Sequence, residues 1–350
     1  MIRLTLLFLI LVFSSPPLQA APTKILFGSC SKEDQNMPIF EAINAEQPDL
    51  FMFLGDNIYA DTTDMQELAA KYQQLGNNPG IKMLRRQTPV IAIWDDHDYG
   101  ENDAGREYTK KQESRKIMLD FWNEPADSVR RNREDGIYTS YTYTHGNNIV
   151  RVIMPDLRWN RPPLNSVSKE EFYQKRNIRN MGPYSPHTDP QLSMLGESQW
   201  KWLEEELKKP ATVRIIASSL QLLAEFTGWE SWANFPADRQ RLISFIQKQQ
   251  IGGVLIVSGD THWGEVSKLD AELSYPLWEV TSSGLTEEWK QISPNRHRIG
   301  EPTHNINYGY IEIDWQQTDP LIQIGLRNVE GEQVTGQRFH LSTLSPRQSR

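Results

Sequence analysis

The feature that most constrains the fold of this sequence is a series of short apolar segments, each of which ends at a group of polar, reactive residues. The segments are apolar at successive positions and rich in β-branched residues, as strands buried on both faces are. Open α/β sheets place their functional groups at the ends of such strands. We therefore expect an α/β protein whose site is assembled where its strands end. The five segments are 24–27, 49–54, 89–94, 213–217 and 254–257.

Patterns of helical periodicity lie between the predicted strands. The clearest is 197–209, in which Trp200, Leu203 and Leu207 share one face and Pro210 ends the pattern. Two segments of alternating polarity around a turn sequence predict a β-hairpin over 138–154. The other predicted helices are 38–46, 65–75, 108–122 and 238–249, and the other predicted strands are 278–281, 308–315 and 321–326.

The segment 158–189 is rich in proline and polar residues and shows little periodicity. It predicts a long surface loop, and loops of this length often act as lids. No boundary between two domains is apparent in the 350 residues, which are enough for one large core. We expect a single domain over 22–341, followed by a flexible tail over 342–350.

The charge of the chain restricts its partners. The formal net charge is −8, from 37 basic and 45 acidic residues, which argues against general nucleic-acid binding because that function needs a basic surface. An anionic small molecule remains compatible as a substrate, because a bound metal can reverse the local field.

The first residues predict a signal peptide over 1–21. Arg3 gives a short positive region, an apolar run covers 4–13, and small residues follow at Ala20 and Ala21. The run is too short for a transmembrane helix, which needs about 20 apolar residues. We expect an exported protein, periplasmic or secreted, with no transmembrane segment after the peptide is removed. The alternative is that the segment is retained as an N-terminal anchor.

Cys30 is the only cysteine, and it closely follows the first predicted strand. An exported protein with one cysteine has no internal disulfide. The thiol is then buried and inert, bonded to another molecule, lipidated, or a metal ligand. Lipidation is disfavoured because Pro22 and Lys24 separate Cys30 from the apolar run.

Two further strand ends carry acidic residues. Asp56 follows the second strand, and Tyr59 lies three residues further on. In the segment 95–98, three aspartates and His97 occupy four positions, a density of negative charge that is costly unless a cation lies among it. The alternatives are an ordinary turn carboxylate at Asp56 and an exposed, solvated acidic loop at 95–98.

Asp260 and His262 follow the fifth strand. Positions i and i+2 of an extended chain face the same side, so we expect both side chains to reach one ion. Such a pair is weak evidence alone, but three acidic strand ends together with Cys30 predict a metal centre.

The types of ligand suggest two unlike metals. Thiolate and phenolate favour a redox-type transition metal such as iron, whereas carboxylates suit a hard ion such as calcium or magnesium. If Asp56 bridged two ions, they would lie about 3.5–4 Å apart, as in two-metal phosphatases.

The order and spacing of these motifs resemble the alkaline phosphatase D (PhoD-like) group of metallophosphoesterases over about 25–314. The matching motifs are Gly28-Ser29-Cys30, Gly55-Asp56-Asn57-Ile58-Tyr59, Trp94-Asp95-Asp96-His97-Asp98, Asp156-Leu157-Arg158, Gly196-Glu197-Ser198-Gln199-Trp200 with Trp202-Leu203, Ser218-Ser219-Leu220-Gln221, Trp232-Ala233-Asn234-Phe235-Pro236 and Ser258-Gly259-Asp260-Thr261-His262.

The resemblance implies a metallophosphoesterase-type four-layer sandwich, in which two facing mixed β-sheets are flanked by helices. It also implies two metals, with another divalent metal as the alternative to either. The implied ligands are Cys30, Asp56, Tyr59 and Asp260 for iron(III), and Asp56, Asp96 and His262 for calcium.

The resemblance further implies roles in catalysis. His97 would polarise the phosphate or protonate the leaving group, Arg158 would hold a phosphate oxygen, and Asn102 is a further candidate phosphate contact. Asp98 stands where the family often has glutamate, which leaves the role of Asp98 open. Many relatives carry an additional N-terminal β-domain, and we expect this chain to lack it because its first core strand begins at Lys24.

We therefore predict an exported metal-dependent phosphoesterase, a phosphomonoesterase or phosphodiesterase, that uses a hydroxide activated by two metals. The expected substrate is a small-molecule or lipid-derived phosphate ester. The alternatives are a metal-stabilised binding protein without turnover and a metallohydrolase that acts on a non-phosphate ester. The two histidines disfavour the first alternative, since purely structural calcium sites use oxygen ligands. Trp229 and Trp232 could form a wall of the substrate site, but we favour simple packing for both, because aromatic side chains mostly supply buried area.

Overall fold

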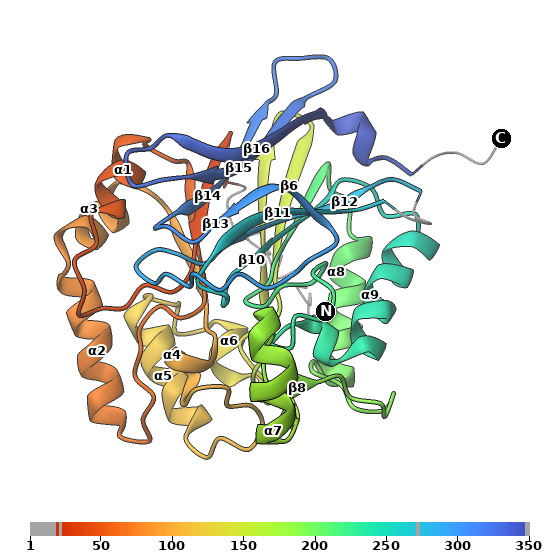
Figure 1. The fold of residues 1–350 in the computed structure, drawn as a ribbon. Helices are drawn as coiled ribbons and strands as arrows, with labels where there is room; N and C mark the ends of the chain where they lie inside the picture. The colour runs from red at the N-terminus through yellow and green to blue at the C-terminus, as the bar shows by residue number, and fades with distance from the viewer. Residues whose placement is uncertain (1–18, 21–22, 271–273, 347–350) are drawn as a thin grey trace, which may run out of the picture.

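Two β-sheets lie face to face and helices cover the outer side of each (Figure 1). The computed structural model describes residues 19–20, 23–270 and 274–346, so the predicted signal peptide lies outside the described residues except for 19–20. Strands β11 and β12 of one sheet pack against β15 of the other, and one continuous apolar core fills the space between the sheets. This arrangement confirms the predicted four-layer α/β sandwich.

The first sheet has eight strands and is mixed. β6, β9, β10 and β12 are parallel neighbours, and β11 runs antiparallel to β12. Its strands, in spatial order, are β1 (Gln19–Ala20), β5 (Thr139–His145), β6 (Asn148–Met154), β9 (Val213–Ala217), β10 (Val254–Ser258), β12 (Leu277–Ser282), β11 (Gly264–Leu269) and β13 (Arg298–Thr303).

The second sheet has six strands and is also mixed. β2, β3 and β4 are parallel, so their carboxyl ends share one edge of the sheet. Its strands, in spatial order, are β16 (Gln333–His340), β15 (Leu321–Arg327), β14 (Tyr308–Asp314), β2 (Lys24–Gly28), β3 (Leu50–Leu54) and β4 (Val90–Ile93).

The helices form the two outer layers. In Figure 1, α1, α2, α3 and α5 lie beside the six-stranded sheet, and α8 and α9 lie on the opposite side of the molecule. All five predicted helices are present. The helices are α1 (Ile39–Ala45), α2 (Met65–Asn77), α3 (Pro79–Gln87), α4 (Asp96–Tyr99), α5 (Lys111–Phe121), α6 (Val129–Asn132), α7 (Lys169–Glu171), α8 (Glu197–Lys208) and α9 (Pro236–Lys248).

The predicted helices do not include α3. The structure shows why the helix forms there: the Asn78 side chain accepts hydrogen bonds from the Gly80 and Ile81 amides, and Pro79 occupies the first turn. Proline is compatible with that position because the first amides of a helix have no intrahelical acceptor. Strands β11, β13 and β16 were also missed.

The segment 158–189 is not an irregular loop. It contains α7, a π-helical turn (Phe172–Arg176), a 3-10 turn (Asn177–Arg179) and a small hairpin of β7 (Asn165–Ser166) and β8 (Tyr184–Ser185). The predicted tail begins within another 3-10 turn (Leu341–Leu344), in which Leu344 is buried and its carbonyl accepts a hydrogen bond from the Gly253 amide at 2.8 Å. Over the described ranges, none of the helices has the length and apolarity needed to cross a bilayer.

Candidate metal centre

The loops after β2, β3 and β10 enter the site through residues with left-handed backbone. The φ angles are 61° at Cys30, 49° at Asp56, 73° at Asp260 and 60° at His262. Non-glycine residues adopt this region rarely, at a cost of about 1–3 kcal/mol each. Its use at four neighbouring positions turns the chain sharply at the strand ends and brings the side chains together.

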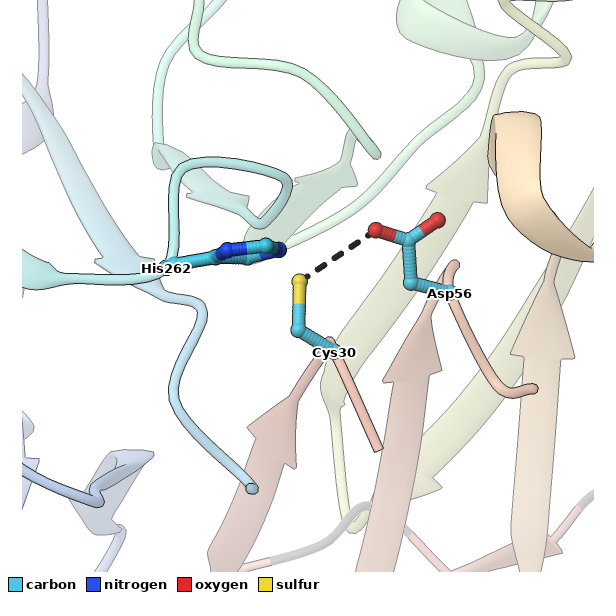
Figure 2. Close-up of side chains that lie close together, drawn as sticks. All are labelled: Cys30, Asp56 and His262. Carbon is cyan, nitrogen blue, oxygen red and sulfur yellow. Dashed lines mark hydrogen bonds between the residues drawn. The ribbon is translucent and has the colours of Figure 1, made fainter. Parts of the chain in front are cut away.

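Cys30, Asp56 and His262 form the first group, and Figure 2 shows their side chains meeting from separate loops. Each offers a ligand atom within 4.8 Å of the other two, and Cys30 Sγ lies 3.3 Å from Asp56 Oδ2. Tyr59 joins this group, because its hydroxyl lies 3.0 Å from His262 Nε2. The Tyr59 ring also stacks on His97 with a centroid separation of 4.2 Å.

Asp56 also belongs to a second group, with Asp96 and His97, whose ligand atoms again lie within 4.8 Å of one another. Asp96 belongs in turn to a third group, with Asp95 and Asp260, and to a fourth, with Asp103 and Glu230. The four groups are therefore continuous, and Asp56 and Asp96 are the carboxylates that connect them.

The extended-chain argument for Asp260 and His262 was wrong. Both residues have positive φ, because the chain turns tightly here and the Thr261 amide donates to the Gly259 carbonyl at 3.0 Å. The two side chains consequently fall into different groups, Asp260 with Asp95 and His262 with Asp56.

The electrostatics of the first two groups favour a bound cation. Burial raises the pKa of Asp56 well above its ordinary value, and the neighbouring Cys30 and Asp96 raise it further. Burial likewise raises the pKa of the Cys30 thiol to about 12. Asp56 Oδ1 is buried without a hydrogen-bond partner. A thiol, a phenol, an imidazole and carboxylates are a ligand set that metal ions bind, so these residues fit the expected metals.

The two histidines differ in charge. Burial lowers the pKa of His97, but the carboxylates of Asp96, Asp56 and Asp61 outweigh it and raise the pKa to about 11. His97 Nδ1 lies 2.7 Å from Asp61 Oδ1. Burial and the charge of His97 lower the pKa of His262 to about 4. His262 is therefore neutral at ordinary pH, which is the form that binds metals.

The structure indicates a supporting role for Asp98. Its carboxylate accepts hydrogen bonds from the Asp95 amide at 2.7 Å, the Asp56 amide at 3.2 Å, the Tyr72 hydroxyl at 3.1 Å and the Asn57 side chain. It thus ties the loop after β3 to the loop after β4. In the described part of the chain, Asp98 is in none of the candidate metal groups.

Arg158 lies among buried carboxylates. Its guanidinium is fully buried and donates to Asp95, to Glu230 at 2.6 Å and to Asp96 at 3.5 Å. Arg161 contacts the other oxygen of Glu230 at 3.1 Å. Sequence reasoning missed Glu230, and a single glutamate outside any motif gives no signal that could have identified it.

The pocket that is lined by members of these groups has a volume of about 220 Å³. Five predicted site residues line it, namely Asp96, His97, Asn102, Asp260 and His262, whereas Cys30, Asp56, Tyr59 and Arg158 are not among the lining residues. The lining is completed by Asp103, Trp229, Glu230, Thr261, Trp263 and Trp289. The packing interpretation holds for Trp232, which is fully buried, but Trp229 faces the pocket.

Comparisons with known proteins identify the fold and the family of the chain. Alkaline phosphatase D of Bacillus subtilis is 23% identical over 302 residues, which cover 74% of this chain and 48% of the relative. The chain thus spans about half the length of this curated relative. A solved structure of PhoD matches with a TM-score of 0.70 at 17% identity, covering 93% of this chain and 70% of that chain.

A dimetal phosphatase from Danio rerio matches with a TM-score of 0.54 at 13% identity, covering 92% of this chain and 100% of that chain. At these identities, the structural matches establish the fold. The sequence model of the PhoD-like phosphatases matches residues 25–320, and this chain therefore belongs to the PhoD-like phosphatase family.

Proposed function

We propose that this protein is an exported phosphoesterase that hydrolyses phosphate esters with the help of two metal ions. Membership of a phosphatase family supports the enzyme class, a phosphoric ester hydrolase. The observation that carries the proposal is the position of Asp56, which is shared by the Cys30–His262 group and the Asp96–His97 group, both of which have members that line one pocket.

The ligand types suggest which ions would bind. Cys30, Tyr59, Asp56 and His262 combine a thiol, a phenol and an imidazole, a set suited to iron(III). Asp95, Asp96 and Asp260 offer only carboxylate oxygens, which suit calcium or another hard divalent ion. This division moves His262 to the iron site and Asp260 to the calcium site, relative to the division that the resemblance implied. When bound, such a pair of cations ionises water near neutral pH and neutralises charge on the phosphoryl oxygens.

The residues of the pocket have separate tasks in this proposal. His97 lines the pocket and is oriented by Asp61, so it can hold a proton for the leaving oxygen. Asn102 lines the pocket and can donate a hydrogen bond to a phosphate oxygen. We assign Arg158 to holding Asp95 and Asp96 in place, because its donors already face carboxylates.

Hydrolysis of 4-nitrophenyl phosphate and bis(4-nitrophenyl) phosphate by the purified protein, combined with elemental analysis, tests the proposal. Asp56→Asn should lower the metal content and reduce kcat at least a hundredfold. Asp127→Asn changes an exposed aspartate and serves as the control. Full activity of Asp56→Asn would exclude this mechanism. Metal binding without hydrolysis of either ester would favour the metal-stabilised binding protein.

Export is supported by the sequence of residues 1–21. If the segment is a cleaved signal peptide, N-terminal sequencing of the protein from the periplasmic or secreted fraction should give a start near residue 22. Recovery of the chain in the membrane fraction with Met1 intact would instead indicate an anchor.

A further inference from the structure

A chain of aromatic rings runs from the pocket to the neighbouring surface. Trp229 and Trp289 line the pocket, with ring centroids 5.7 Å apart. Trp229 also contacts Phe172 at a centroid distance of 6.4 Å, and Phe172 contacts Tyr173 at 5.0 Å. We call these four rings the aromatic wall. Trp263 adds a further indole to the pocket lining.

The backbone that carries the wall is closely packed. The Gly182 amide donates to the Thr227 carbonyl at 3.1 Å, and the Tyr184 amide donates to the Gly228 carbonyl at 2.8 Å. Gly228 has a φ of +83°, and a Cβ there would lie 2.6 Å from the Gly182 carbonyl oxygen. Only glycine fits this contact, which holds Trp229 against the segment that carries Phe172 and Tyr173.

Both ends of the aromatic wall reach solvent, and Ile178 is exposed near Tyr173 in the sequence. Tyr173 is 63% exposed, Ile178 74% and Trp289 38%, and these are three of the six large apolar side chains that are exposed in the described ranges. The segment that follows Tyr173 contacts the segment that follows Trp289, because the Asn180 side-chain amide donates a hydrogen bond to the Ile292 carbonyl at 3.4 Å. Apolar side chains that gather beside a pocket mark a binding surface.

The polar side chains of the pocket are concentrated at the metal-ligand groups. Six of the eleven lining residues are aspartate, glutamate or histidine. Of the other five, Asn102 and Thr261 have neutral side chains that can accept a hydrogen bond, and the three tryptophans each offer one indole N–H donor and no acceptor. A sugar or polyol needs several neutral donors and acceptors to replace its water. The aromatic wall offers mainly apolar area, so it is poorly matched to such a group.

We propose that the alcohol esterified to the phosphate is apolar, an alkyl or aryl group, and that it packs on the aromatic wall. This inference rests on the proposed phosphoesterase function and names the substrate class of the same pocket. Each methylene that becomes buried on the wall should strengthen binding of the transition state roughly fourfold.

The test is a series of esters with increasing chain length, assayed with the metal-loaded full-length protein. kcat/KM is measured for methyl, butyl and octyl phosphate, for the matching methyl alkyl diesters, and for glycerol 3-phosphate. We expect kcat/KM to rise roughly two- to fourfold per methylene over the first carbons, and butyl phosphate to exceed glycerol 3-phosphate. The nitrophenyl esters report the proposed function separately.

Substitutions in the aromatic wall test whether the wall causes the dependence of kcat/KM on chain length. Trp289→Ser and Tyr173→Ser should each reduce the octyl-to-methyl ratio of kcat/KM, and Trp289→Phe should restore most of it. The ratio is taken within each variant, so a general loss of activity cancels. Val129→Ser on α6, where Val129 is 62% exposed, is the matched control for Tyr173→Ser and should keep the wild-type ratio.

The outcomes separate the two proposals. Equal kcat/KM from methyl to octyl, or a preference for glycerol 3-phosphate, in a protein that cleaves the nitrophenyl esters would overturn the apolar substrate class alone. Chain-length dependence that survives unchanged in both serine variants would overturn the assignment to the wall. If no ester were hydrolysed, the proposed function itself would fail.

Discussion

Replacing Arg158 by methionine distinguishes a substrate contact from a buried structural cation. In the structure the guanidinium is fully buried and has carboxylate partners at Asp95, Asp96 and Glu230. Methionine keeps an unbranched apolar stem but removes the positive charge, so three buried carboxylates lose their shared partner. Removing one partner of a buried ion pair typically costs about 3–5 kcal/mol, because an uncompensated charge remains.

We therefore expect Arg158→Met to lower the free energy of unfolding in urea by about 3–5 kcal/mol. Glu230 keeps Arg161 at 3.1 Å, which favours the lower end of that range. The cost of Glu230→Gln should be smaller in the Arg158→Met background, with a coupling free energy of about 1–3 kcal/mol. Arg86→Met changes an exposed arginine on α3 and should stay within about 0.5 kcal/mol of the wild type.

A direct phosphate contact predicts a different pattern, in which hydrolysis falls and stability does not. Urea unfolding followed by far-UV circular dichroism measures stability, and kcat/KM on 4-nitrophenyl phosphate measures hydrolysis. An Arg158→Met variant with the wild-type unfolding midpoint and slope but impaired hydrolysis would refute the buried-cation reasoning. It would return Arg158 to the phosphate-binding role that the family resemblance implies.

Three further predictions concern stability. Chelation should lower the thermal unfolding midpoint, because the buried carboxylates around Asp56 lose their compensating charge; an unchanged midpoint in protein shown to be metal-free would contradict this. Burial raises the pKa of the Asp238 carboxyl above 3.8, so the native state binds this proton more tightly than the unfolded state does. The contribution of Asp238 to stability should therefore fall as the pH rises above about 4. The urea midpoint of the wild type relative to Asp238→Asn should be lower at about pH 7 than at about pH 4. Leu344→Ala should cost about 2–5 kcal/mol if the last turn is packed as described, and a wild-type midpoint would show that it is not.

The strand framework could be predicted because local signals determine it. The apolar runs that end at Cys30, Asp56 and Asp260 are short, continuous and bounded by turn residues, and parallel pairing then brings the ends of β2 and β3 to one edge. Most of the predicted ligands consequently meet in the structure. The π-helical turn at Phe172–Arg176 was not predicted from local pattern, and its Phe172 contacts Trp229, a residue distant in the sequence.

The role of Arg158 could not be predicted from its motif. An arginine two residues after an aspartate at a strand end is compatible with a phosphate contact and with a buried ion pair. The choice depends on Glu230, which lies 72 positions further along the chain and reaches Arg158 only in the folded protein. A single sequence contains no local signal for such a pairing.

Polar side chains beside the candidate ligands hold the strained backbone of those ligands in place. Four ligand-bearing positions have positive φ, and each such residue costs about 1–3 kcal/mol, so the surrounding contacts must stabilise the strained backbone. These contacts are specific: the Ser29 hydroxyl accepts from the Asp260 amide, the Ser283 hydroxyl from the His262 amide, and Asp98 from the Asp56 amide.

Ser283 also lies 3.1 Å from Cys30 Sγ, so one hydroxyl supports two members of the first group. A supporting side chain of this kind binds no metal in the proposed scheme, yet its loss would leave a buried amide without an acceptor. The geometry of the centre therefore depends on polar residues just after β2 and β12, which come together only when the two sheets face each other. The ligand motifs identify the chemistry, whereas the facing of the sheets determines whether the ligands can act together.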